Sequence, residues 1–419
     1  MSADQPVARL DVGALDGAWQ QGQVVLLAPP QLASSQAASA QPRPAALQAL
    51  AASWGPGVVV GSGGSTGGRR WCFQPLSNLQ ASAAATAAWL QAQGMDPASC
   101  LHLNPLPLHH VSGLMPLVRS RSWGAQHQGL PAELLRQPHL LAEAAPLPPG
   151  QPAVLSLVPT QLARLLADVG ARAWLRQLAV VWVGGAALPD DLAQLARQEE
   201  IRLAPCYGAT ETAAMVCALT PERFLAGDGG CGQPLVDVAV RIDPLTGAVE
   251  VATDRLSPGW IGAGVANGGD GLEPLPRTTD GWWRSGDGGL LGPAGLEILG
   301  RLDGAILSGA ETVFPEQLEQ RLRLLAKREG WPLKELLLLG VAEPGWGERL
   351  TALLRPEPGA DGTALIRSLE LAVMAWPPAE RPRRWLLCEP LAPSPAGKWE
   401  RHHWQQWLQA QSPGQWPGS

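Results

Sequence analysis

The chain has 419 residues, of which 46% are hydrophobic and 16% charged, so it is globular and long enough for two domains. Its formal net charge of −6 argues against a nucleic-acid-binding surface, which is normally basic. No apolar run approaches the roughly 20 residues of a membrane span, and Met1–Pro6 lack the features of a signal peptide. The six cysteines show no zinc-like spacing. We therefore expect a cytoplasmic protein with reduced cysteines and no membrane span.

The first half of the chain alternates β-branched apolar runs with segments of helical composition. Strands that alternate with helices predict an α/β domain with a mainly parallel sheet. In chain order we expect an amphipathic segment at 45–54, a strand at 58–60, a helix at 77–92, a strand at 153–158, a helix at 160–166 capped by Thr160, and a strand at 178–183 that another helix follows.

The composition changes near Gly227, because glycine, aspartate, proline and valine then dominate as far as Gly300. This composition is typical of short strands and turns, so we expect a β-rich end to the first domain. We place the domain boundary at Asp303, which gives domains 1–303 and 304–419. In the second domain we expect helices at 315–327 and 365–375 and a strand at 336–341.

The segment Cys206–Thr212 combines a phenol, a glycine, two threonines and a carboxylate, and its Tyr207 is the only tyrosine beside 18 tryptophans. A flat ring, hydroxyls and a carboxylate suit a site that holds an aromatic ligand, a phosphate and a cation. The alternative is a purely structural role, in which Tyr207 packs in the core and Glu211 is a solvated acid at the start of a helix.

A glycine-rich loop, Gly61–Arg70, follows the strand expected at 58–60. Its glycines allow backbone N–H groups to surround an anion, and its serine and threonine hydroxyls add donors. No Gly-Lys-Ser/Thr closes the loop, so it is not a Walker A loop. A flexible surface loop is the alternative, and the preceding strand favours phosphate binding.

These segments resemble the acyl-adenylate-forming superfamily, which includes acyl-CoA ligases, luciferases and peptide-synthetase adenylation domains. The loop is similar to the family's Thr-Ser-Gly-Ser-Thr-Gly-x-Pro-Lys, although Gly63, Arg69 and Arg70 depart from it. The family's Tyr-Gly-x-Thr-Glu is matched in full by Tyr207–Glu211. The resemblance implies an α/β fold with a large N-terminal domain of mainly parallel sheets and a small mobile α+β C-terminal domain.

The resemblance also assigns ATP and Mg²⁺ to this region. Tyr207 would lie along the adenine, Thr210 would contact the α-phosphate, and Glu211 would hold Mg²⁺. The expected nucleotide contacts from the two motifs are Ser62, Ser65, Thr66, Gly67, Tyr207 and Gly208.

Two later motifs are similar to the family's ribose and hinge segments. Gly281–Asp287 resembles Trp-Phe-x-Thr-Gly-Asp, which implies that Asp287 accepts the ribose hydroxyls. Gly300–Asp303 matches Gly-Arg-x-Asp, which implies that Arg301 touches ribose or phosphate and that Asp303 is the hinge between domains. A turn residue is the alternative for Asp287.

The segment Pro393–Arg401 resembles the family's C-terminal motif with its catalytic lysine. Lysine is scarce here, since Lys327, Lys334 and Lys398 are the only three. The resemblance implies that Lys398 bridges the substrate carboxylate and the phosphate during adenylation. A solvated tail lysine is the alternative.

Other matches concern the acid and the thiol. His110 stands at the histidine that lies beside the acyl carboxylate in the family. The resemblance implies that Gly184, Gly185 and Ala186 form a wall of the acyl and adenine pocket, although these glycines could equally just end a strand. Ser308 is a second candidate, in addition to Arg119, for a contact with the acid. The wall of the thiol tunnel would contain Gly309, Ala310 and Glu311.

The matches follow the family order from Ser62 to Arg401, which implies a two-step ligase that uses ATP, Mg²⁺ and coenzyme A. Ser112–Ser120 resembles the 2-succinylbenzoate–CoA ligases of menaquinone and phylloquinone synthesis. Such an acid has a second carboxylate, and Arg119 could bind it, although a surface position is the commoner fate of an arginine. Another aromatic acid, delivery to a carrier protein and an inactive adenylate-binding protein are the alternatives. The sequence leaves open whether the protein forms a homo-oligomer.

Overall fold

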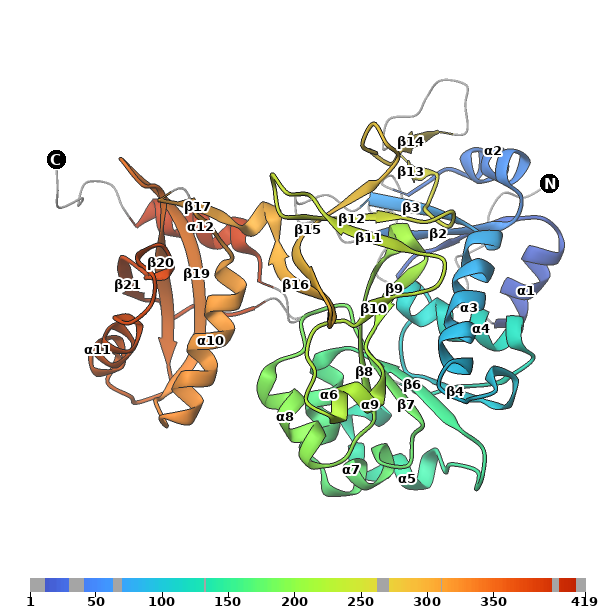
Figure 1. Cartoon of the computed structure of the whole chain (residues 1–419), viewed down its shortest axis with the longest axis horizontal. Helices are drawn as coiled ribbons and strands as arrows, with labels where there is room; N and C mark the ends of the chain where they lie inside the picture. The colour runs from blue at the N-terminus through green and yellow to red at the C-terminus, as the bar shows by residue number, and fades with distance from the viewer. Residues whose placement is uncertain are drawn as a thin grey trace. The chain divides into compact units, whose positions relative to one another are not determined.

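The computed structural model describes residues 12–29, 41–62, 70–131, 133–261, 271–309, 311–393 and 399–411. The chain divides into two compact units, Met1–Ile298 and Leu299–Ser419, which are described separately below (Figure 1). This division precedes Asp303, whose role as a hinge remains a prediction. None of the described helices combines the length and the apolar composition that a membrane span requires. All six cysteines are free.

The centre of the first unit is a seven-stranded sheet in which β5, β4, β6, β7 and β8 run parallel, and β9 is antiparallel to both of its neighbours, β8 and β10. The predicted strands at 153–158 and 178–183 are confirmed as β6 and β7 in this sheet. In sheet order the strands are β10 (Gln233–Pro234), β9 (Ala214–Ala218), β8 (Leu203–Ala209), β7 (Val180–Val183), β6 (Ala153–Leu157), β4 (Leu101–Asn104) and β5 (Gln126–Gly129).

The central strands β6 and β7 are buried on both faces, which explains why they are continuous apolar runs. Successive side chains point to opposite faces, so Leu155 and Val181 pack with α6, α7 and α8, whereas Val154 and Val180 pack on the side of α3. The helices of this unit are α1 (Val12–Gln20), α2 (Pro44–Trp54), α3 (Leu76–Gln91), α4 (Val111–Trp123), α5 (Leu141–Ala144), α6 (Pro159–Leu166), α7 (Val169–Leu175), α8 (Asp190–Gln198) and α9 (Pro221–Leu225). Short 3₁₀ turns are η3 (Pro97–Ser99), η4 (Leu134–Arg136), η5 (Pro138–Leu140) and η6 (Thr210–Thr212).

The predicted threonine cap of α6 is wrong. Val158 is the N-cap and Pro159 takes the first helical position, where its fixed φ and missing N–H cost nothing. The Gln161 side chain accepts a hydrogen bond from the Val158 N–H at 3.1 Å. Thr160 is exposed one position further along.

Two further sheets of the first unit carry the segments that matter for the site. In the five-stranded sheet β1 and β2 are parallel and the other neighbours antiparallel; its order is β1 (Val24–Leu27), β2 (Gly57–Ser62), β3 (Arg70–Pro75), β13 (Gly259–Ile261) and β14 (Leu272–Pro274). A four-stranded sheet contains β11 (Ala239–Ile242), β12 (Ala248–Ala252), β15 (Trp283–Gly292) and β16 (Gly295–Arg301). The β-rich composition noted after Gly227 corresponds to these short strands.

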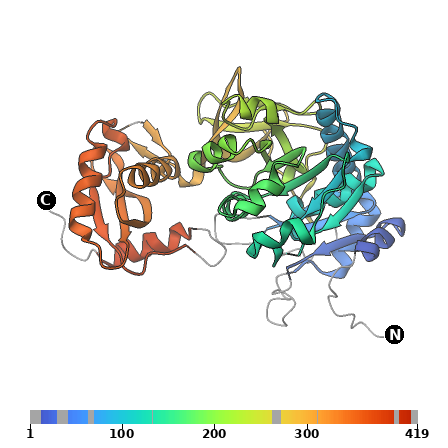
Figure 2. The same ribbon diagram turned by 90° about the horizontal axis from the view of Figure 1, so that it is seen from below.

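The second unit is an α+β structure around one sheet (Figures 1 and 2). Helices α10 and α11 cover one face, where Leu322 and Leu369 pack on Leu338, and α12 covers the other through Trp404. The sheet is β18 (Glu311–Val313), β17 (Ile306–Ser308), β20 (Gly347–Pro356) and β19 (Leu333–Glu343), with β21 (Arg384–Leu387) beside β20. The helices are α10 (Pro315–Arg328), α11 (Gly362–Val373) and α12 (Arg401–Ala410), and the 3₁₀ turns are η7 (Leu302–Gly304) and η8 (Pro378–Glu380).

Candidate functional site

Two side chains expected at the nucleotide meet in the first unit. Tyr207 on β8 donates its hydroxyl hydrogen to Asp287 Oδ2 on β15 at 2.6 Å. Both residues are half-buried, and the Tyr207 ring packs at the margin of a hydrophobic cluster. A ring with one accessible part and an adjacent carboxylate can serve a ligand with an aromatic base and hydroxyl groups.

Glu211 lies in η6, directly after β8, and is 9% exposed. The indole N–H of Trp260 donates to its Oε1 at 2.9 Å, and the N–H of Ser257 donates to its backbone oxygen at 2.7 Å. Within the described residues, Glu211 Oε2 accepts no hydrogen bond. Glu211 is therefore not a solvated acid, and its second oxygen is available for a cation.

The buried side chain of Arg255, which is 1% exposed, binds the turn that carries Glu211. Its guanidinium donates to the backbone oxygens of Thr212 and of Met215, the latter at 2.9 Å, and pairs with Asp237 Oδ2 at 2.6 Å. The turn needs such support because Ala213, with φ of 52°, is in the left-handed region that L side chains rarely adopt.

Other side chains complete this support. Gln74 Nε2 donates to the Thr210 oxygen at 2.6 Å, and Ser82 Oγ donates to the Ala213 oxygen at 2.6 Å. Thr210 and Glu211 are thus fixed by β3 and α3 as well as by Arg255.

The glycine-rich loop begins and ends at paired residues. Ser62 is the last residue of β2 and pairs with Arg70, the first residue of β3. The Arg70 guanidinium carbon lies 4.7 Å from the centre of the Trp260 ring. Ser65, Thr66 and Gly67 lie outside the described residues. The two ends of the loop are nevertheless adjacent to the Trp260–Glu211 pair.

The glycines after β7 lie against neighbouring strands. A Cβ on Gly184 would lie 2.9 Å from Cys206 Sγ, so close approach of β8 requires glycine there. Gly185 has a φ of 80°, and Ala186 is exposed. This segment is therefore beside the start of the Cys206–Thr212 motif; its role as a pocket wall remains a prediction. Gly208 is exposed, and a Cβ there would collide with the Ala214 backbone.

His110 is the exposed N-cap of α4, the helix that contains Arg119. Arg119 is not a surface residue, since it is 4% exposed and its guanidinium carbon lies 5.0 Å from the centre of the Trp182 ring. Burial lowers the pKa of Arg119 to about 10, so it remains charged at neutral pH. Burial and the Arg119 charge lower the pKa of the adjacent His102 to about 3.

Arg119 has no ion pair among the described residues, and its Nε has no hydrogen-bond partner there. A buried cation without a carboxylate is costly, and such groups commonly complete their pairing with a ligand.

Several site residues predicted from the motifs belong to the second unit. Arg301 Nη2 pairs with Asp303 Oδ2 at 3.2 Å. Ser308 is fully buried, and its Oγ has no hydrogen-bond partner in the described part of the unit. Gly309, with φ of 58°, faces the Trp346 ring, and Glu311 is exposed. Ala310 and Lys398 lie outside the described residues.

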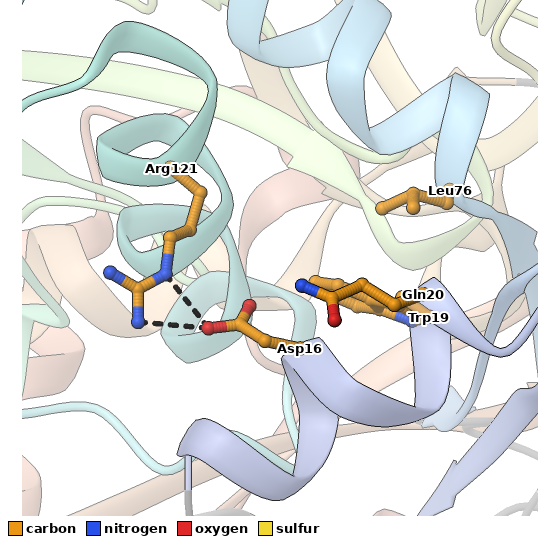
Figure 3. A pocket seen from close by; sticks show the side chains of 5 residues that line it. All are labelled: Asp16, Trp19, Gln20, Leu76 and Arg121. Atoms are coloured by element: carbon orange, nitrogen blue, oxygen red, sulfur yellow. Dashed lines mark hydrogen bonds and ion pairs between the residues drawn. The ribbon is translucent and has the colours of Figure 1, made fainter.

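A separate surface pocket of about 360 Å³ lies where α1, α3 and α4 meet (Figure 3). Arg121 Nη2 pairs with Asp16 Oδ2 at 2.9 Å across it, so its two charges neutralise each other. The pocket contains none of the residues expected from the motifs; its lining is Asp16, Trp19, Gln20, Leu76 and Arg121.

Trp260, Arg255 and Gln74 were not expected from the sequence. Trp260 lies 49 residues after its partner Glu211 in the chain. The only local signal is the turn sequence Pro258-Gly259 before it, which predicts a strand start and no partner.

Residues 11–253, more than half of the chain, match the family model described as AMP-binding enzyme. The 2-succinylbenzoate–CoA ligase of Geobacillus sp. (strain WCH70) is 27% identical over 308 residues, which are 72% of this chain and 59% of that ligase. The chain therefore spans about three fifths of the length of this curated relative.

Two solved structures are similar. Wild-type MenE of E. coli with a bound m-phenylether-linked analogue of OSB-AMS is 26% identical, with a TM-score of 0.60, over 84% of this chain and 69% of that one. The o-succinylbenzoate CoA synthetase (MenE) of Bacillus subtilis, in complex with the acyl-adenylate intermediate OSB-AMP, has a TM-score of 0.67 at 21% identity, over 83% of this chain and 68% of that one. The second likeness shows a shared fold and confirms the α/β class. By its family match, the chain belongs to the AMP-binding enzymes.

Proposed function

We propose that this protein is an ATP-dependent acid–CoA ligase, with 2-succinylbenzoate as its acid in menaquinone or phylloquinone biosynthesis. The observation that carries the proposal is that Tyr207, which is hydrogen-bonded to Asp287, and Glu211, which is held by Trp260, lie on one short segment of an AMP-binding enzyme. The names of the relatives supply the acid, and the cytoplasmic location expected from the sequence belongs to the same proposal.

The proposed reaction has two steps. A carboxylate oxygen attacks the α-phosphorus of ATP, the bond to the bridging oxygen breaks, and pyrophosphate leaves with that electron pair. The coenzyme A sulfur, after losing its proton, then attacks the acyl carbon, and AMP leaves as the carbon–oxygen bond breaks. Tyr207 would border the adenine and Asp287 would accept from the ribose, while Thr210 would contact the α-phosphate.

The residues present fit a magnesium ion. Glu211 is a carboxylate held by Trp260 through one oxygen, and carboxylate oxygen is the ligand that Mg²⁺ prefers. When bound, the ion would offset negative charge on the phosphate oxygens. Glu211 would bind and orient this ion. Trp260 holds its carboxylate, and the Ser257 N–H holds its backbone oxygen.

The acid can be tested directly. We expect ATP–pyrophosphate exchange and thioester formation to be fastest with 2-succinylbenzoate when it is compared with benzoate, 4-hydroxybenzoate and a fatty acid. If 2-succinylbenzoate is no better than the others, the assigned acid is wrong while the ligase proposal stands. Exchange without turnover on free coenzyme A would favour a carrier protein, and no exchange with any acid would favour a non-catalytic adenylate-binding protein.

The buried cation Arg119 supports an acid with a second carboxylate, because it has a charge and no ion-pair partner in the described residues. Arg119→Met keeps the volume and removes the charge. We expect it to raise the KM for 2-succinylbenzoate by roughly 10- to 100-fold, as a lost charged hydrogen bond of about 1.5–3 kcal/mol implies, and to leave the KM for benzoate within about twofold.

Arg121→Met is the matched control, since Arg121 lies on the same helix with 51% of its side chain exposed and an exposed ion pair contributes little. If Arg119→Met loses activity equally toward 2-succinylbenzoate and benzoate, Arg119 has only a structural role, in packing against the central sheet.

A further inference from the structure

The ring of Trp260 lies between two groups of opposite charge. On β13, Trp260 is directly opposite Cys72 of β3. Arg70 is two residues from Cys72 and so points to the same face, diagonally across from Trp260. The ring centre and the Arg70 guanidinium carbon are 4.7 Å apart, which is cation–π geometry.

The other contact of this ring is its hydrogen bond to Glu211. An indole N–H is a donor only and makes one such bond, here to Oε1 at 2.9 Å. Trp260 is 7% exposed, so the bond is shielded from water. The same stretch of chain, through the Ser257 N–H, also holds the Glu211 backbone.

Arg70 and Glu211 therefore contact one ring without pairing with each other, since no ion pair joins them among the described residues. A direct ion pair would neutralise the cation and the carboxylate. With the ring between them, each keeps its charge for a ligand that is itself mixed in charge, such as a polyphosphate with a divalent cation.

We propose that Trp260 is a positioning residue that separates Glu211 from Arg70 and orients both toward the cation and the phosphates of ATP. The inference rests on the proposed function and assigns Trp260 a role that acts through its two neighbours. Arg70 thereby becomes the phosphate cation at the end of the glycine-rich loop, and its planar guanidinium stacks on the ring where an ammonium has no plane to stack.

Trp260→Phe separates the two contacts, because it keeps a ring for Arg70 and removes the donor to Glu211. We measure binding of ATP and of AMP to the full chain by calorimetry, with Mg²⁺ and with EDTA. Loss of one hydrogen bond to a charged group predicts roughly 10- to 100-fold weaker ATP binding with Mg²⁺. ATP binding in EDTA and AMP binding are expected to stay within about twofold.

Arg70→Met tests the other contact and is safe for folding, since Arg70 is exposed. We expect it to weaken ATP binding with and without Mg²⁺ by roughly 10-fold, in line with a charge-assisted phosphate contact, and to leave AMP binding unchanged. The matched control is Trp283→Phe, a buried tryptophan of the same hydrophobic cluster, 4% exposed.

The outcomes separate the role of Trp260 from the proposed ligase activity. If Trp260→Phe and Trp283→Phe bind ATP with Mg²⁺ equally well, or if Trp260→Phe weakens ATP and AMP alike in both buffers, Trp260 is only a packing residue and the inference fails. If the unaltered protein binds ATP but shows no exchange with any acid, the proposed ligase activity fails while the role of Trp260 stands. If the unaltered protein binds no ATP, both fail.

Discussion

Lys398→Ala is expected to lower acyl-AMP formation by about 10²- to 10³-fold, the usual cost of removing one group that stabilises transition-state charge. Formation of the thioester from supplied acyl-AMP should remain largely intact, because the proposed ammonium neutralises charge only while the carboxylate attacks the α-phosphate. Pyrophosphate exchange measures the first step, and chromatography of the CoA thioester measures the second. The role of Lys398 rests on the motif at Pro393–Arg401 and on the scarcity of lysine.

Lys334→Ala is the control for Lys398→Ala, since Lys334 is an exposed lysine of the same unit, on β19. We expect neither step to change in this variant. An equal loss of both steps in Lys398→Ala would contradict the assignment, because a residue needed for folding or for both ligands affects the two alike.

Elements of the first unit could be predicted where the sequence pattern is local. The strands at 153–158 and 178–183 are buried on both faces, so their apolar runs are continuous, and the alanine-rich segment at 77–92 forms α3. The start of α6 was misjudged by two residues, because a proline at the first helical position replaces the side-chain cap that Thr160 would supply.

The site could be predicted one residue at a time but not as an arrangement. Tyr207 and Asp287 each belong to a recognisable motif, whereas their hydrogen bond joins residues 80 positions apart. The burial of Arg119 was also missed, since the apolar face of α4 packs on a sheet whose neighbours are distant in the chain. Trp260 belongs to no recognisable motif, because its hydrogen bond joins it to Glu211, 49 positions away in the chain.

Arg255→Met is expected to lower the free energy of unfolding of the first unit by about 3–5 kcal/mol, because each buried carbonyl left without its donor costs about 1–3 kcal/mol. Arg255 is 1% exposed, and its guanidinium donates hydrogen bonds to Asp237 and to the backbone oxygens of Thr212 and Met215. Methionine fills the space of the arginine stem but donates to none of them. Urea unfolding followed by near-ultraviolet circular dichroism measures the change, with Arg121→Met as an exposed control.

The variant Asp237→Asn shows how much of this lost stability comes from the ion pair and how much from the backbone carbonyls. The Asp237 side chain is 31% exposed, so water can solvate it when its partner is lost, whereas the carbonyl of Thr212 belongs to a buried residue. We therefore expect Asp237→Asn to cost only about 1 kcal/mol, since a neutral hydrogen bond remains, and most of the Arg255→Met penalty to come from the unsatisfied carbonyls. If both variants lose the same stability, the ion pair is the main support of the turn. If the carbonyls dominate, Arg255→Met also releases the turn at Ala213, so Mg²⁺-dependent ATP binding at Glu211 should weaken even where the protein remains folded.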